Sequence, residues 1–553
     1  MKKLLFLFTV FVMLSGELFA LPVDSTTFNS SNITNNITLT NDKSYRIKGF
    51  NYIKNGATVS IQPGTYIIGD FNTKGTLIFE RGSKIYANGT AGQPIVFTSQ
   101  KPVGQRNSGD WGGIIILGRA GINTATGVDS AEIEGFGAGL GPIYGGQPRN
   151  DADSSGLLRY VRIEFAGINL TGVSGNEING LTMGGVGSKT VIEYVQVSYS
   201  GDDSFEWFGG TVNCKYLVAY KGLDDDWDTD NGFRGKVQFG LSVRDSGYYD
   251  VSTSNGFESD NNTNNPVSGS YNGPRTKPVF SNMTVIGPFS ATNLTLNSLW
   301  GRGAHQRRAS QMNVFNSIVM GWKTGVRFDG NGVYEGANGD TVRWKNDIIA
   351  GNVRLADTAA STSFSTQAWL QTGAFGNTAL SSASGILTNP WNVYPDNAAN
   401  VNNWVPAGGS PALTGASFSD ANLAGFEVTT YRGALGSGSN WLTGWTQWDP
   451  KNYATVSVQA ISTEIPSAFK LAQNFPNPFN PSTKINFSIP KAGFVILKVY
   501  DLTGKEVSSL VNENLSIGTY GVDFNAAKLT SGIYFYTLKT ENFSETKKMM
   551  LIK

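Results

Sequence analysis

The sequence has few of the residues that most often carry enzyme chemistry. Its 553 residues include one cysteine, Cys214, and one histidine, His305. A single cysteine excludes an internal disulfide, so the fold must be stabilised by burial of a core. A single histidine argues against a Ser-His-Asp triad, a zinc site or a histidine base. The basic loop around it (GRGAHQRR, 301–308) could hold an anion, but a solvated turn is the simpler interpretation.

Charge and helical periodicity are scarce as well. Charged residues make up 15% of the chain and the net charge is +1, which argues against nucleic acid as the main partner. Beyond the N-terminal segment, no stretch shows sustained helical periodicity. Glycine is abundant, with 67 residues, and occurs among many Asn, Thr and aromatic residues. This composition predicts an all-β chain with many turns.

Long apolar runs are missing except at the N-terminus. Lys2 and Lys3 precede an apolar run over residues 4–14, which is well short of the ~20 residues that a spanning helix needs. The layout is that of a secretory signal peptide over residues 1–20. We expect cleavage after Ala20, with a cut after Gly16 as the alternative. The mature chain is then expected to have no transmembrane segment.

Short β-rich runs that end at glycine recur through residues 21–450. The glycines are spaced 21 to 40 residues apart and are Gly167, Gly201, Gly222, Gly247, Gly287, Gly321 and Gly351. The shorter intervals match one coil of a solenoid and the longer ones a coil with an inserted loop. We therefore predict a right-handed parallel β-helix over 21–450, with a polar N-terminal cap at 29–40. A propeller, which would show a steadier period of about 40–50 residues, and tandem sandwiches are the alternatives.

The segments near the end of the chain differ in composition. Residues 360–440 are low in charge and rich in Ser, Ala, Gly and Asn, which predicts long loops and a loose closing cap. Residues 451–470 are predicted to be a linker. From 471 to 553, short alternating segments separated by Gly493, Gly504, Gly518 and Gly532 predict a small antiparallel β-sandwich.

Four motifs of this last domain carry a resemblance. FPNPFNPST at 475–483 is too rich in proline for a helix or a central strand, and KKMMLIK ends the chain. With VYDLTGKEV at 499–507 and SGIYFYTLK at 531–539, they resemble the C-terminal sorting domain (type A) of the type IX secretion system of Bacteroidetes-type bacteria. The resemblance implies handling by that machinery and a location that is extracellular or on the outer-membrane surface. The matching motif residues are Phe475, Pro476, Asn477, Pro478, Lys547 and Lys548.

The preceding part resembles a family of secreted Bacteroidetes-type parallel β-helix surface proteins of unsettled function. The resemblance rests on GTLIFERGSKIYANGTAGQPIVFTS at 75–99, GDWGGIIILG at 109–118 and GDDSFEWFGGTVNCKYLVAY at 201–220. It continues through DDDWDTDNGFRGKVQF at 224–239 and GWTQWDP at 444–450. It implies a fold and a location rather than an activity.

An acidic belt crosses the middle of the predicted solenoid. Residues 202–260 hold twelve acidic and five basic side chains, in a chain that is otherwise positive. Equivalent positions on adjacent coils lie about 4.8 Å apart. Stacked carboxylates at that spacing repel one another unless a cation or arginines lie between them.

Four of these acids occupy every second position: Asp224, Asp226, Asp228 and Asp230. Hard oxygen ligands in this number suit Ca²⁺, so the four are predicted metal ligands. The loop starts like an EF-hand, but Val237 stands where the bidentate acid should be, which excludes a true EF-hand. A solvated acidic turn pinned by Arg234 or Arg244 is the alternative to calcium.

Aromatic side chains lie among the acids. Trp207, Phe208, Trp227 and Phe257 are candidates to stack on sugar rings, and core ladders of the solenoid are the alternative. Glu206, Asp228 and Glu258 are the catalytic candidates, because paired carboxylates are what glycoside hydrolysis requires. No acid–base pair or lyase motif is diagnostic, so binding of a glycan or another surface partner, with structural calcium, is preferred. A polysaccharide lyase or glycoside hydrolase, and a structural adhesion or surface-layer component, are the alternatives.

Overall fold

The computed structural model describes residues 23–136, 139–169, 177–262, 271–359, 363–393, 401–438, 440–452, 459–462, 466–491, 493–515, 517–526 and 529–553. The predicted signal peptide lies outside these residues. The chain divides into two units, one of Val23–Ala454 and one that contains Thr455–Lys553.

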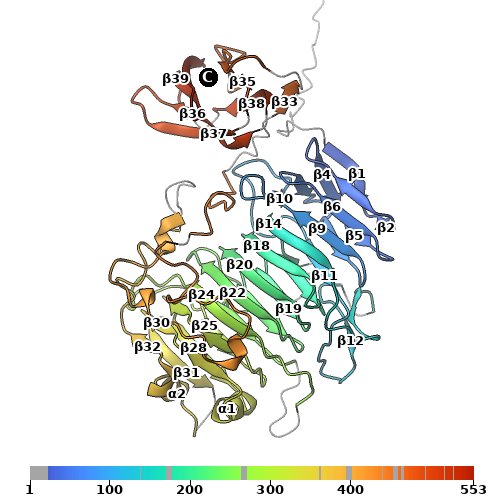
Figure 1. The fold of residues 1–553 in the computed structure, drawn as a ribbon, viewed down its shortest axis with the longest axis vertical. Helices are drawn as coiled ribbons and strands as arrows, with labels where there is room; N and C mark the ends of the chain where they lie inside the picture. Colours follow the sequence, from blue (N-terminus) through green and yellow to red (C-terminus); the bar gives the residue numbers. More distant parts are fainter. Residues whose placement is uncertain are drawn as a thin grey trace, which may run out of the picture. The chain divides into compact units, whose positions relative to one another are not determined.

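The first unit is a solenoid of parallel strands. Its larger sheet has 17 strands, which are β1 (Val23–Asn29), β3 (Ile37–Leu39), β4 (Ser44–Lys48), β6 (Thr58–Ile61), β7 (Tyr66–Gly69), β9 (Lys84–Asn88), β10 (Ile95–Ser99), β14 (Gly156–Glu164), β18 (Val191–Ser198), β20 (Asn213–Tyr220), β22 (Lys236–Val243), β24 (Val279–Ile286), β26 (Asn313–Phe315), β27 (Ile318–Met320), β29 (Arg343–Lys345), β30 (Ile348–Ala350) and β32 (Thr378–Leu380). In Figure 1 these strands lie coil upon coil along the unit.

The second sheet of the solenoid has 11 parallel strands. They are β2 (Asn32–Ile33), β5 (Phe50–Ile53), β8 (Thr76–Phe79), β11 (Gly113–Leu117), β17 (Leu181–Gly184), β19 (Phe205–Phe208), β21 (Trp227–Asp230), β23 (Phe257–Ser259), β25 (Arg302–Gln306), β28 (Thr324–Asp329) and β31 (Arg354–Ala359). Each strand pairs with its counterpart one coil away, so the prediction of a parallel β-helix is confirmed over a propeller or tandem sandwiches.

Short elements decorate the coils. They are the hairpin β12 (Ser130–Glu132) with β13 (Ile143–Gly145), the pair β15 (Ile168–Asn169) with β16 (Glu177–Ile178), helices α1 (Asn331–Asn338) and α2 (Thr366–Leu370), and 3₁₀ turns η1 (Gly373–Phe375), η2 (Val401–Trp404), η3 (Pro411–Leu413) and η4 (Ala421–Leu423).

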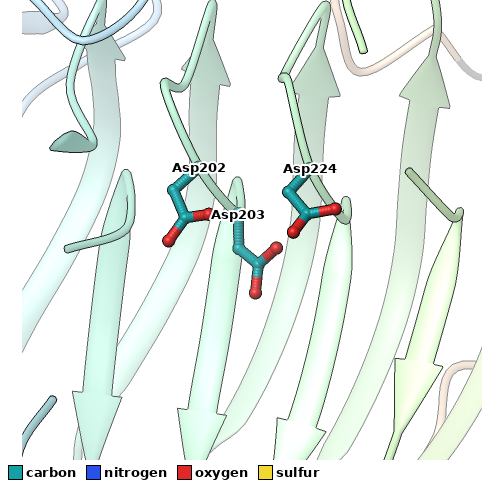
Figure 2. Close-up of side chains that lie close together, drawn as sticks. All are labelled: Asp202, Asp203 and Asp224. Carbon is teal, nitrogen blue, oxygen red and sulfur yellow. The ribbon is translucent and has the colours of Figure 1, made fainter. Parts of the chain in front are cut away.

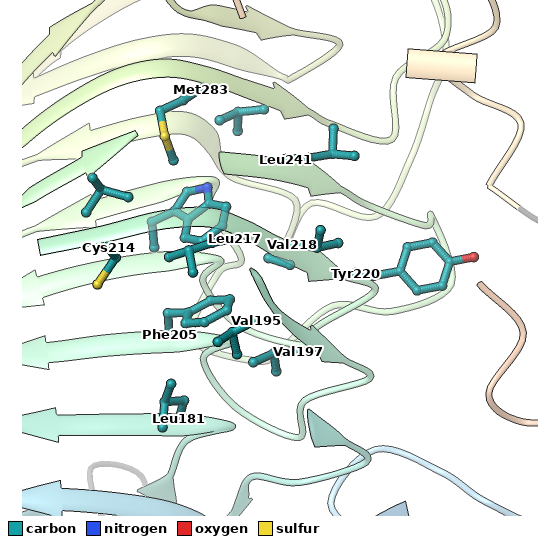
Figure 3. Close-up of a cluster of buried hydrophobic side chains, with 14 of the residues drawn as sticks. Leu181, Val195, Val197, Phe205, Cys214, Leu217, Val218, Tyr220, Leu241 and Met283 are labelled. Carbon is teal, nitrogen blue, oxygen red and sulfur yellow. The ribbon is translucent and has the colours of Figure 1, made fainter. Parts of the chain in front are cut away.

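The interior between the sheets is apolar from coil to coil. Figure 3 shows part of it, where Phe205 and Leu181 from the smaller sheet lie near Val195 and Leu217 from the larger one. These side chains are fully buried. Cys214 is a free, buried member of the same core, so the structure agrees that the chain relies on apolar burial instead of a disulfide.

One corner of the coils is built from aromatic residues in the left-handed backbone region. Tyr160, Tyr194, Tyr216 and Phe239 have φ between 50° and 62°. Non-glycine residues rarely adopt this region. Their rings stack on successive coils, with centroids 4.4, 4.4 and 5.0 Å apart. The stacking contributes energy that offsets the backbone strain.

The segment predicted to be a loose cap is instead packed along the larger sheet. We call residues 411–438 and 440–452 the return segment, because its partners move back toward the N-terminus as the chain advances. The backbone N–H groups of Ser417, Glu427 and Gln447 donate hydrogen bonds to the side chains of Asn316, Gln238 and Gln196, respectively. The carbonyl of Pro450 accepts a hydrogen bond from the side chain of Arg106. Trp445 and Trp448 are 1% exposed. The prediction of a loose cap is therefore wrong for residues 411–438, and residues 440–452 continue the same packing.

The second unit holds two antiparallel sheets. One contains β33 (Gln459–Ser462), β34 (Lys470–Leu471), β35 (Ser482–Ile489) and β38 (Gly518–Asn525), and the other β36 (Gly493–Tyr500), β37 (Glu506–Leu515), β39 (Gly532–Lys539) and β40 (Ser544–Leu551). Alternate residues such as Val495, Leu497 and Val499 are buried in a core separate from that of the solenoid. This arrangement confirms the predicted antiparallel β-sandwich.

Candidate functional site

The outward face of the smaller sheet carries one row of titratable side chains across six coils. Within β21, Trp227 is buried and Asp228 faces outward, because successive side chains of a strand alternate between faces. The parallel register then places equivalent residues next to one another. We call them the outward row: Glu206, Asp228, Glu258, His305, Arg327 and Asp357.

The turns that lead into these strands add more carboxylates. Oxygens of Asp203, Glu206 and Asp228 lie within 4.8 Å of one another, as do those of Asp225, Asp228 and Glu258. A third group consists of Asp202, Asp203 and Asp224. Figure 2 shows this group, with Asp202 and Asp203 on one turn and Asp224 on the next. The three groups share members and form one continuous cluster, in which Asp202, Asp203, Glu206 and Asp225 are buried.

Six of these acids form no ion pair within the part of the chain that the structure describes. We call them the carboxylate cluster: Asp202, Asp203, Glu206, Asp224, Asp225 and Asp228. Their polar contacts come from neutral groups; Asp203, for example, accepts from the backbone N–H of Asp225 at 2.8 Å. The Oδ1 atom of Asp228 is buried and has no hydrogen-bond partner.

Acids next to the cluster do form ion pairs. Arg307 pairs with both Glu258 and Asp260, and Arg308 pairs with Asp260 at 2.7 Å. His305 lies between Glu258 and Asp329, with N–O distances of 3.6 and 3.3 Å. Within the outward row, the acids that form no ion pair thus lie at one end. Glu258 occupies the next coil, and basic side chains begin one coil further on, at His305.

The pKa values separate the cluster from Glu258, although burial also raises the pKa of the paired Asp260. Burial, followed by the charges of neighbouring carboxylates, raises the pKa of Asp203, Glu206 and Asp228 well above the usual range. Burial also raises the pKa of Asp224, to about 7. Burial opposes ionisation of Glu258 too, but His305 and Arg307 outweigh it and lower its pKa. Ionising the whole cluster at neutral pH therefore calls for a cation.

Comparison with family models gives a match to a pectate-lyase-like β-helix domain over residues 31–394. The chain belongs to this β-helix family. A second match, to the secretion system C-terminal sorting domain, covers residues 473–553. No curated protein and no solved structure matches the chain.

The sorting domain establishes where this pectate-lyase-like β-helix protein is delivered. It is handled by the type IX secretion machinery and exported to the cell surface or the extracellular space. In the described residues, no helix has the length and apolar character needed to span a membrane.

In this β-helix, the four predicted metal ligands do not surround one ion. Asp224 and Asp228 join the carboxylate cluster, but Asp226 turns inward. Its Oδ2 atom accepts from Arg244 Nε at 2.8 Å, and both side chains are fully buried. Asp230 lies outside the three groups, near Asp260, and burial raises its pKa to about 7. The four-residue set is therefore corrected, because Asp226 precedes the strand and escapes its alternation.

The aromatic candidates also need correction. Trp207, Trp227 and Phe257 are 0% exposed and Phe208 is 6% exposed. Phe205 stacks on Trp227 at 5.2 Å, and Trp207 stacks on Phe233 at 5.3 Å. Trp207, Trp227 and Phe257 belong to the core ladders that were the alternative interpretation, and a sugar cannot stack on them without opening the coil. Phe208 lies in a separate apolar cluster, where its ring centroid is 6.0 Å from that of Tyr144.

Two residues of the site were missed in the sequence. Asn179 is buried, and its amide donates to Glu206 and, at 3.4 Å, to Glu134 Oε1. Burial raises the pKa of Glu134 to about 7, while its contact with Glu206 acts in the opposite direction. Glu134 follows β12, far from the acidic belt in sequence, and no spacing or motif signals its approach. Only the fold of its loop over the sheet brings it to Glu206.

Proposed function

We propose that this secreted β-helix protein binds an acidic glycan through Ca²⁺ held by the carboxylate cluster. Asp203, Glu206 and Asp228 are the central ligands, and Asp225 and Asp224 flank them. The carrying observation is the set of converging carboxylates that form no ion pair within the described residues, beside Glu258 and Asp260, which are both paired with Arg307. Hard oxygen donors in this number match the coordination that Ca²⁺ prefers.

The outward row supports an anionic ligand. Beyond the cluster it continues into His305 and Arg327, and Arg302 lies on the same strand as His305. A polymer with regularly spaced carboxylates that followed the row would meet the cation first and guanidinium groups on the next coils. Arginine suits such contacts because its planar donors match a carboxylate. Buried aromatic rings take no part in this mode of binding.

The test is retention of the purified full chain on immobilised polygalacturonate or alginate, with calcium or with chelator. We expect calcium-dependent retention, no retention on neutral dextran, and loss of retention in an Asp203→Asn, Asp228→Asn double variant. Retention that is equal with chelator and calcium would refute the role of the cation. Calcium-dependent stability without retention on either polymer would leave the cluster a structural site in a surface component.

Polysaccharide elimination is the second candidate, because basic side chains follow the cluster on the same face. A lyase needs an unprotonated base near the sugar. On this face, the guanidinium of Arg307 is bound by two carboxylates, and Glu258, Asp260 and Asp228 raise its pKa against the effect of burial. This arrangement favours binding over catalysis. Release of unsaturated sugar ends from either polymer, abolished by Asp228→Asn, would reverse that preference.

A further inference from the structure

The proline-rich motif and the last strand of the sorting domain form one structure. Strand β40 pairs with β39 and is the last strand of its sheet. The motif lies along its other edge: Phe479 N–H donates to the Met550 carbonyl at 2.9 Å, and Ile552 N–H donates to the Phe479 carbonyl at 3.0 Å. Asn477 Oδ1 accepts from Met550 N–H at 2.9 Å. The edge is therefore covered by a segment whose prolines lack an N–H donor, which discourages further strand pairing.

The two phenylalanines of the motif have opposite environments. Phe479 is 2% exposed and contacts Phe524 in the core, with ring centroids 6.0 Å apart. Phe475 is 82% exposed. Its backbone is nevertheless fixed, since it exchanges two hydrogen bonds with Lys484 at 2.9 and 3.0 Å. A large apolar ring is thus held in solvent by an ordered backbone, and it contributes nothing to the core.

The last strand and the residues after it also carry exposed apolar side chains. Met550 is 39% exposed and Ile552 is 50% exposed. Lys548 and Lys553 are exposed on the same terminal segment. The Asn477 bond ties Met550 to the motif two residues after Phe475. Exposed apolar side chains with a basic rim, on fixed backbone, are a common form of protein-binding surface.

We infer that the type IX machinery recognises this composite surface in its folded form: Phe475, Met550 and Ile552 enter an apolar site on the machinery, and Lys548 and Lys553 meet acidic groups at its rim. The occupant is assigned by the sorting-domain match, which places this unit in contact with that machinery. The inference rests on that match and is independent of the proposal for calcium and glycan.

The experiment expresses full-chain variants in a host with a type IX system and measures surface protein by protease shaving. We expect Phe475→Ala and Met550→Ala each to reduce surface delivery by about tenfold, because each removes apolar area from the contact. Phe494→Ala is the matched control, since Phe494 is 49% exposed elsewhere in the same unit and lies outside the sorting motifs. It should be delivered like wild type.

Stability separates recognition from folding. Phe475→Ala should leave the melting temperature unchanged and the retained chain protease-resistant, whereas Phe479→Ala should lower the melting temperature of the sorting unit. Phe475→Leu, which keeps an apolar side chain, should restore most of the delivery. Normal export of Phe475→Ala, or an equal loss in Phe494→Ala, would overturn the inference.

Discussion

At the scale of single residues, two aspartates that are close in sequence have different roles. Asp228 lies outward in the carboxylate cluster, whereas Asp226, two positions earlier, is sealed in the core with Arg244. A buried ion pair that loses one partner leaves an uncompensated charge in a low-dielectric interior. The two aspartates should therefore respond differently to one substitution.

Asp228→Asn should abolish stabilisation by calcium. An ion that binds only the native state raises stability by mass action, so the melting temperature of the wild type should rise with calcium. Asp226→Asn should cost roughly 3–5 kcal/mol with calcium or chelator, because it breaks the buried pair. Calorimetry of both variants with and without the ion checks this. A normal calcium response in Asp228→Asn would exclude it as a ligand.

Lys221 provides a pH-dependent prediction away from the cluster. It is fully buried 2.9 Å from Asp245, and burial lowers its pKa to about 8. Between pH 8 and 10.5 the unfolded state binds more protons than the folded state, so the free energy of unfolding rises with pH across this range. The contribution of Lys221 to stability is therefore present above pH 10.5 and is lost as the pH falls through about 8. Its size is on the order of 3 kcal/mol. Denaturant unfolding across this range should show the rise, which Lys221→Met should remove and Lys189→Met, at an exposed turn, should keep.

At the scale of elements, the return segment joins coils that are far apart in sequence. Its Trp445 meets the rings of Tyr160 and Tyr194 edge-on, with centroids 6.0 Å from each. The backbone carbonyls of Gln447 and Glu427 in this segment accept hydrogen bonds from the side chains of Gln196 and Gln238, respectively. Solenoid coils contact mainly their neighbours, so a segment that crosses several coils increases their cooperativity.

Trp445→Ala should destabilise the solenoid by about 3–5 kcal/mol, since it removes a buried aromatic side chain and leaves a cavity. Val428→Ala is the control within the same segment, because Val428 is 79% exposed. Its effect should stay within about 0.5 kcal/mol. Urea unfolding of both variants gives the comparison. Equal effects would show that the return segment does not hold the coils.

At the scale of the whole molecule, the solenoid and the signal for export belong to separate units. The solenoid and the sorting unit have separate hydrophobic cores. Removal of residues 470–553 should leave the solenoid folded but abolish surface delivery. Protease shaving of intact cells checks delivery, and the melting temperature of the retained protein checks folding. Equal surface signal with and without the segment would contradict the assignment.

The sequence by itself determined the fold class and the destination. Runs such as YVRIEFAG and YVQVSYSG, each closed by a glycine, became β14 and β18 of adjacent coils. The two terminal motifs identified the sorting domain. Both signals are local, because strand propensity, turn residues and prolines act within a few positions.

Only the tertiary structure decided which acids meet. Glu134 reaches Glu206 through a long loop, and Asp226 meets Arg244 from the next coil instead of joining Asp228. The register between coils depends on insert lengths and on where each strand begins, and alternation within one segment does not contain that information. The same limit applies to Trp207 and Trp227. Their positions in the sequence suit either face, and the start of each strand turned them inward, so the core holds the rings while the carboxylates remain outside.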